Sequence, residues 1–227
     1  MRAAEAVIFD LDGTLIQSRH DGKEMRRRIE DILVRAGVPA SEIDMSKRIW
    51  EILKNGKSAL ESTGQHPERV AWTMSRLMEA INEVELGVVE SVKPMTHAHK
   101  VLEKLRELGM KIGIATRSCN AYAIRSLELT DLIRYVDVLL ARDDVENPKP
   151  DPRHLLQVVS ALGASVCSAV YIGDSSTDLV TAGGAGIVFI GFFRSEEREK
   201  RLKKAGCEIL IDDLRRIVDF VEEKLNL

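Results

Sequence analysis

Short runs of apolar residues recur along the chain, with helical patterns between them. The first run, Ala6 to Phe9, ends in acidic residues and Gly13, which is typical of a buried strand that opens into a loop at its carboxyl end. Similar runs follow at 111–115, 136–140, 169–172, 187–190 and 208–211. Between such runs, apolar residues at helical spacing in the stretch 101–108 share one face and precede Gly109. Strand and helix in alternation predict an α/β fold with a doubly wound parallel sheet, covered by helices on both faces.

Residues 17–93 interrupt this alternation, because the apolar spacing there is helical and no convincing strand is present. One apolar helix face precedes Gly37 and is made of Met25, Ile29, Ile32 and Leu33. A second follows Pro67 and is made of Val70, Met74, Leu77, Met78 and Ile81. Between them, Lys54-Asn55-Gly56-Lys57 has the composition of a turn. The pattern predicts a small all-α domain at 17–93, inserted into a core made of 1–16 and 94–227, with Pro94 at the return to the core.

Composition narrows the partners and the location. The 227 residues carry 33 basic and 36 acidic side chains, without a basic stripe that would neutralise a nucleic-acid backbone, so no nucleic-acid partner is expected. The longest apolar run, 183–193, is far shorter than the roughly 20 residues that cross a bilayer, and no membrane segment is expected. Three widely spaced cysteines fit neither a zinc site nor a disulfide framework and favour a cytoplasmic protein.

The strongest chemical signal follows the first predicted strand. Ligands of an open parallel sheet bind at the carboxyl ends of the strands, and Asp10-Leu11-Asp12-Gly13-Thr14-Leu15 begins at such an end. In a locally extended chain, side chains two positions apart point the same way, so the carboxylates of Asp10 and Asp12 could face one ligand. Gly13 permits the turn that follows.

Three further polar clusters fall at or near other strand ends. Thr116-Arg117-Ser118 offers a hydroxyl and free amides ahead of a helix, a favourable place for an anion. Prolines in 147–152 stiffen a loop that presents Lys149. The fourth cluster, 173–178, supplies the carboxylates of Asp174 and Asp178. Each cluster alone has an ordinary structural explanation as a turn or a helix cap, but their order and their positions favour one shared site.

From Val7 to about Ile190, these four clusters resemble the motifs of the haloacid dehalogenase superfamily of hydrolases, above all in Phe-Asp-Leu-Asp-Gly-Thr-Leu at 9–15. The layout is similar to that of phosphoglycolate phosphatases, and the insert resembles the small helical cap, of C1 type, found in that superfamily. The resemblance implies a Rossmann-like core with the active site at the junction of core and cap.

Residue roles follow from the same resemblance. It implies that Asp10 is the nucleophile and that Asp12 is the general acid and base. Thr116 and Lys149 would bind the phosphate as part of the catalytic set, and Arg117 would join them in substrate binding. Mg²⁺ would be held by Asp10, by the backbone carbonyl of Asp12, by Asp174, and through water by Asp178.

Elementary chemistry is consistent with these roles. A phosphate dianion repels an attacking carboxylate, so positive charge from Mg²⁺, Lys149 and helix-end amides must gather first. The sequence therefore predicts a Mg²⁺-dependent phosphatase acting through a phospho-aspartyl intermediate on a small phosphorylated metabolite, of the phosphoglycolate or sugar phosphate class. A phosphomutase of the beta-phosphoglucomutase type and a non-catalytic, phosphate-responsive binding protein stay open as alternatives. Either a monomer or a homodimer fits the pattern.

Overall fold

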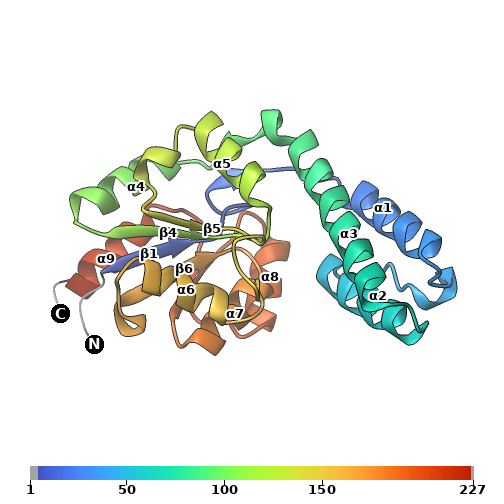
Figure 1. The fold of residues 1–227 in the computed structure, drawn as a ribbon. Helices are drawn as coiled ribbons and strands as arrows, with labels where there is room; N and C mark the ends of the chain where they lie inside the picture. The colour runs from blue at the N-terminus through green and yellow to red at the C-terminus, as the bar shows by residue number, and fades with distance from the viewer. Residues whose placement is uncertain (1–4, 226–227) are drawn as a thin grey trace. The chain divides into compact units, whose positions relative to one another are not determined.

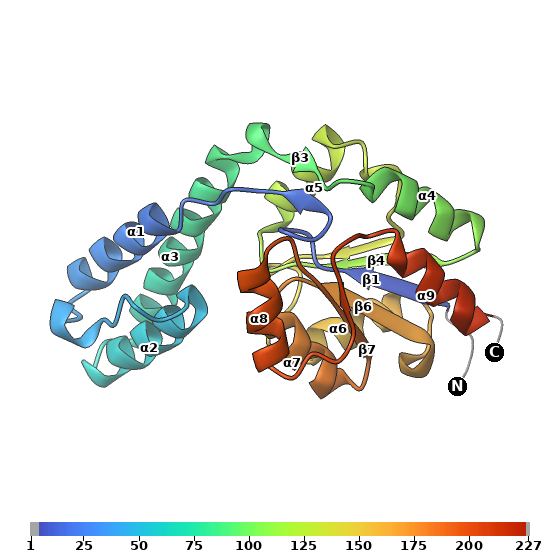
Figure 2. The ribbon, with the colours of Figure 1, turned by 180° about the vertical axis from the view of Figure 1, so that it is seen from behind.

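The core of the molecule is a parallel β-sheet flanked by helices (Figures 1 and 2). The structure is a computed structural model that describes residues 5–225, so the outermost residues of the predicted core, 1–4 and 226–227, lie outside it. The sheet has six strands in the order β5-β4-β1-β6-β7-β8, and every pairing is parallel. These strands are β1 (Ala6–Phe9), β4 (Lys111–Ala115), β5 (Val138–Leu140), β6 (Ala169–Gly173), β7 (Val188–Phe192) and β8 (Leu210–Ile211).

Strand β1 lies at the centre of the sheet, where the strand order reverses. After β1 the chain builds β4 and β5 on one side, then crosses to β6 on the other. Phe9 pairs with Ile114 of β4 and with Ile172 of β6, so the three strands end almost level. Loops at the ends of such strands form the usual ligand site of a doubly wound sheet.

Helices cover both faces of the sheet. In Figure 1, α4 (Ala98–Glu107) and α5 (Asn120–Leu129) lie over one face, and α6 (Arg153–Ala161) and α7 (Ser176–Ala185) over the other. Helix α9 (Arg216–Leu225) packs beside α4, and Leu202 of α8 (Glu196–Lys204) joins a core cluster that includes Ile8, Leu155, Tyr171 and Ala182. The predicted fold class is confirmed. None of the described helices is both long and apolar enough to cross a membrane.

Some strand limits differ from the predicted ones. Strand β5 begins only at Val138, after a turn of 3-10 helix at Ile133–Tyr135, and β8 is limited to two residues. A further pair of two-residue strands, β2 (Ile16–Gln17) and β3 (Lys93–Pro94), forms a separate antiparallel ribbon. Two residues are too few for an alternating pattern, so the sequence gives no sign of this ribbon.

Residues 19–88 form a compact unit of their own. The sheet belongs to a second unit, which consists of one segment up to Ser18 and another from Val89 onward. The smaller unit contains α1 (Gly22–Arg35), α2 (Ile49–Ser62) and α3 (Pro67–Gly87). Its apolar core is built from the faces of the three helices and includes Met25, Ile29, Leu33, Leu60, Val70, Leu77 and Ile81. That this unit serves as a cap, with bounds 17–93, stays a prediction.

The expected turn at Lys54–Lys57 is wrong, because helix α2 continues through these residues. Gly56 is buried, and a Cβ atom placed on it would lie only 2.9 Å from Cδ1 of Leu33 in α1. The glycine therefore allows α2 to approach α1 closely. Its role is in helix packing, at the cost of a lower helix propensity.

Candidate active site

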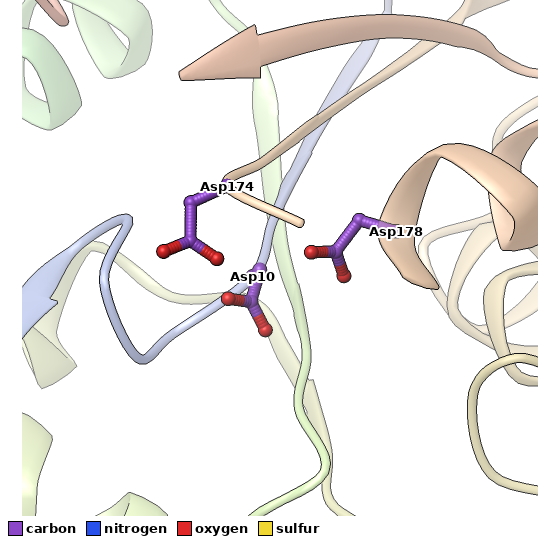
Figure 3. Close-up of side chains that lie close together, drawn as sticks. All are labelled: Asp10, Asp174 and Asp178. Atoms are coloured by element: carbon purple, nitrogen blue, oxygen red, sulfur yellow. The ribbon is translucent and has the colours of Figure 1, made fainter. Parts of the chain in front are cut away.

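The sheet brings three aspartates together at its carboxyl edge (Figure 3). Asp10 directly follows β1, Asp174 follows β6, and Asp178 lies in the first turn of α7. The backbone N–H of Asp10 donates to the Ile172 carbonyl at 2.8 Å, which ties the end of β1 to β6. One carboxylate oxygen from each aspartate lies within 4.8 Å of the others, and the three carboxylates lie side by side in the figure.

This group is chemically suited to a hard divalent cation. It offers carboxylate oxygens without nitrogen or sulfur, a donor set that fits Mg²⁺ better than zinc. The Asp12 side chain is not among the three, and the predicted role of its backbone carbonyl stays a prediction. Asp174 also forms an ion pair with Arg198 of α8. Nothing in the sequence pattern around Arg198, in a helix of alternating charge, indicated this contact.

Lys149 connects two of these aspartates. Its Nζ lies 2.7 Å from Asp10 Oδ1 and 2.8 Å from Asp178 Oδ1, with 1% of its side chain exposed. It also donates to the Tyr171 hydroxyl at 2.7 Å, and Tyr171 in turn donates to Asp178 at 2.6 Å. Because a buried ammonium needs full compensation, this arrangement commits Lys149 to a single position. Sequence reasoning found Lys149 but missed Tyr171, whose hydroxyl stands inside an otherwise apolar strand.

The protonation states follow from burial and these contacts. Burial raises the pKa of Asp10 to about 7, with Asp178 and Asp12 adding to the rise and Lys149 opposing it. Burial would also raise the pKa of Asp178, but Lys149 and the hydroxyl of Tyr171 help to hold that pKa below its ordinary value. Despite burial, Asp10 and Asp178 raise the pKa of Lys149. Asp178 and Lys149 thus stay charged, whereas Asp10 titrates near neutral pH even beside Lys149, and further positive charge would favour its ionised form.

A buried histidine fixes the backbone of the Lys149 loop. The Lys149 N–H donates to His154 Nδ1 at 3.2 Å, and Nε2 of the same ring lies 3.0 Å from the Leu140 carbonyl at the end of β5. Nδ1 must accept here, so the ring is the neutral tautomer with its proton on Nε2. Burial lowers the pKa of His154 to about 4, which keeps the ring neutral. The ring thereby anchors the loop to the sheet.

The Asp12 carboxylate is engaged on both oxygens. Ser118 Oγ donates to Oδ2 at 2.7 Å, and the Tyr122 hydroxyl donates to Oδ1 at 3.0 Å. Burial, and next the charge of Asp12, raise the pKa of Tyr122, so the phenol remains a donor. Ser118 also donates its N–H to Thr116 Oγ1 at 3.1 Å. Ser118 thus links two of the predicted residues, Thr116 and Asp12. The sequence placed Ser118 in the same cluster as Thr116 but did not indicate its contact with Asp12.

Arg117 lies in the same loop and is exposed. Its carbonyl accepts a hydrogen bond from Nη1 of Arg142 at 2.6 Å, which supports the loop backbone. The predicted contact of the Arg117 side chain with substrate stays a prediction.

A family model described as "Haloacid dehalogenase-like hydrolase" matches residues 7–192, which include all four polar clusters. The chain belongs to the haloacid dehalogenase-like hydrolases. The predicted family is therefore confirmed.

Relatives within this hydrolase family carry different names. The chain is 30% identical over 216 residues to "Phosphorylated carbohydrates phosphatase" of Thermotoga maritima, covering 91% of this chain and 94% of the relative. It is 28% identical over 193 residues to a phosphoglycolate phosphatase of Cupriavidus necator, covering 80% and 78%. A crystal structure from Thermotoga maritima, provisionally assigned as a beta-phosphoglucomutase, has 28% identity and a TM-score of 0.64, covering 96% of this chain and 99% of that one.

Proposed function

We propose that the chain is a Mg²⁺-dependent phosphatase that cleaves a small phosphomonoester through a phospho-aspartyl intermediate on Asp10. The observation that carries this proposal is the buried contact of Asp10 with Lys149, at a sheet edge where two more carboxylates converge. Hydrolysis of phosphoric monoesters agrees with the family match and with the named relatives.

In the proposed first step, the Asp10 carboxylate attacks phosphorus in line with the leaving oxygen. Lys149 keeps one oxygen of Asp10 fixed at 2.7 Å, which leaves the other oxygen for attack. Held by Asp10, by the Asp12 backbone carbonyl and by Asp174, and through water by Asp178, Mg²⁺ would supply positive charge that favours ionised Asp10 and offsets the charge of the phosphate. The raised pKa of Asp10 supports this need for a cation.

Asp12 completes the reaction by moving protons. An alkoxide leaves poorly, so Asp12 donates a proton to the leaving oxygen and later takes one from the water that hydrolyses the aspartyl phosphate. Thr116 directly follows β4, the strand beside β1, and its buried hydroxyl is the proposed partner of a phosphate oxygen. Asp12 and Thr116 both lie within the hydrogen-bonded network through Ser118, which supports a joint role.

The proposed substrate is a small phosphorylated metabolite such as phosphoglycolate or a sugar phosphate. Relatives with names of both kinds support the class and leave the choice within it open. The structural relative assigned as a beta-phosphoglucomutase keeps a phosphomutase as a second candidate. A cytoplasmic location and a monomeric or homodimeric state stay predictions.

The decisive test is phosphate release from a panel containing phosphoglycolate and several hexose phosphates, with Mg²⁺ and with EDTA. Asp10→Asn should reduce kcat more than about a thousandfold, as expected for removal of a nucleophile. Asp131→Asn is a matched control, because Asp131 is exposed and has a φ of 55° that asparagine tolerates. Full activity in Asp10→Asn would overturn the assignment, and isomerised hexose phosphate without free phosphate would favour the mutase.

A further inference from the structure

Two hydroxyl groups hold the Asp12 carboxylate, one at each of its oxygens. Ser118 and Tyr122 each contact a different oxygen of the Asp12 carboxylate, at 2.7 Å and 3.0 Å. A carboxylate held at one oxygen can still rotate about its last bond, whereas donors on both oxygens fix the plane of the group. The direction of the Asp12 lone pairs is thereby set by two side chains from another part of the sequence.

The two donors are themselves held firmly. Tyr122 is fully buried in α5, and Ser118 is 6% exposed just before that helix. At the start of α5, the Asn120 N–H donates to Asp143 at 2.7 Å, and the Asn120 side chain donates to Asp144 at 2.8 Å. These contacts hold the backbone that carries both hydroxyl groups in place at the start of α5.

We propose that Ser118 and Tyr122 are positioning residues that aim the Asp12 carboxylate for proton transfer. The inference rests on the proposed function, because it requires that Asp12 act as general acid. Ser118 additionally fixes the proton-transfer group relative to the phosphate-binding hydroxyl, since its backbone N–H contacts Thr116 at 3.1 Å. Tyr122 supplies the second contact and stops rotation of the carboxylate.

This role predicts a dependence on the leaving group. A misaligned acid slows departure of a basic alkoxide, which needs a proton, and barely affects a nitrophenolate, which leaves without one. The parameter kcat/KM reports steps up to the formation of the phospho-enzyme and the departure of the first product. It therefore isolates the acid role of Asp12 from its later role as base.

The experiment compares 4-nitrophenyl, phenyl and benzyl phosphate, which are similar in size and increase in leaving-group basicity. Wild type and Asp10→Asn are measured first, followed by Ser118→Ala, Tyr122→Phe and the control Tyr135→Phe. The control removes a phenol hydroxyl that accepts a hydrogen bond from Arg134 instead of donating one to Asp12. We expect kcat/KM for benzyl phosphate to fall roughly tenfold in both test variants, with less than about a twofold change for 4-nitrophenyl phosphate.

Equal losses on all three substrates, or no loss, in variants with wild-type thermal unfolding would overturn the positioning role. Because the two variants change different elements, a folding defect in one leaves the other as a test. If wild-type turnover itself does not depend on Asp10, the proposed function fails, and that result is known before any Ser118 or Tyr122 variant is measured.

Discussion

Stability below neutral pH should depend on His154. The ring is fully buried, and its Nδ1 accepts the Lys149 N–H, so protonation at that atom would break the bond. It would also add a positive charge that the Lys149 ammonium disfavours. The pKa of His154 is lowered from 6.5 to about 4, primarily by burial. The unfolded chain therefore binds a proton at a higher pH than the folded protein does, and stability is lost as pH falls from 6.5 toward 4.

The magnitude can be worked from these two pKa values. Between about pH 7.5 and about pH 5, uptake of a proton by the unfolded chain alone should reduce the free energy of unfolding by about 2 kcal/mol. The glutamine in His154→Gln does not titrate, so the variant lacks this loss. Other groups, including the carboxylates, titrate in both proteins and cancel in the difference.

Urea unfolding of wild type and His154→Gln at several pH values measures this difference. The variant should be less stable at neutral pH by about 1 kcal/mol, the usual effect of a weakened hydrogen bond. The gap should close, and the order should reverse, as the pH approaches 5. Parallel stability curves for the two proteins across this range would show that His154 does not take up its proton at different pH values in the folded and unfolded states.

Three further substitutions probe the site and the core. Gly13→Ala should reduce activity more than about tenfold, because Gly13 has a φ of 85° and a Cβ atom there would overlap the Asp174 carboxylate; unchanged kcat/KM would contradict this. Arg198→Ala should tighten Mg²⁺ binding about two- to fivefold in calorimetry, because the partly exposed guanidinium pairs with Asp174; weaker binding would show that Arg198 assists the site. Gly113→Ala should lower the free energy of unfolding by about 1–3 kcal/mol in urea, since its Cβ would lie 2.6 Å from Cγ1 of Val158. An equally stable variant would argue against tight packing at this position.

The pattern of the sequence predicted the sheet, and the meeting of carboxylates at its edge, for a clear physical reason. Buried parallel strands appear as continuous apolar runs, and polar residues at their carboxyl ends must meet at one edge. Asp10 and Asp174 follow from this rule, since β1 and β6 are neighbours. No strand directly precedes Lys149, so its role came from its place among the clusters and from the family resemblance.

The supporting residues could not be predicted in the same way. Tyr171 resembles any aromatic residue of a buried strand, and the sequence does not show that its hydroxyl meets Lys149. His154 contacts Leu140, and Tyr122 contacts Asp12. These partners are brought together only when the chain folds, so no spacing in the sequence indicates the contacts. The expected turn at Lys54–Lys57 failed because Gly56 serves helix packing, which composition alone does not distinguish from a turn.

The small ribbon of β2 and β3 has a consequence for the modularity of the chain. Ile16 pairs with Pro94 and Gln17 with Lys93, so the segment between them departs and returns at adjacent points. All six strands of the large sheet lie outside that segment. Replacement of the insert by one of different length or sequence would therefore leave the register of the sheet unchanged and would close a gap only one strand spacing wide. Evolution, or a protein engineer, can exchange this part of the molecule while the carboxylate-bearing edge is inherited intact.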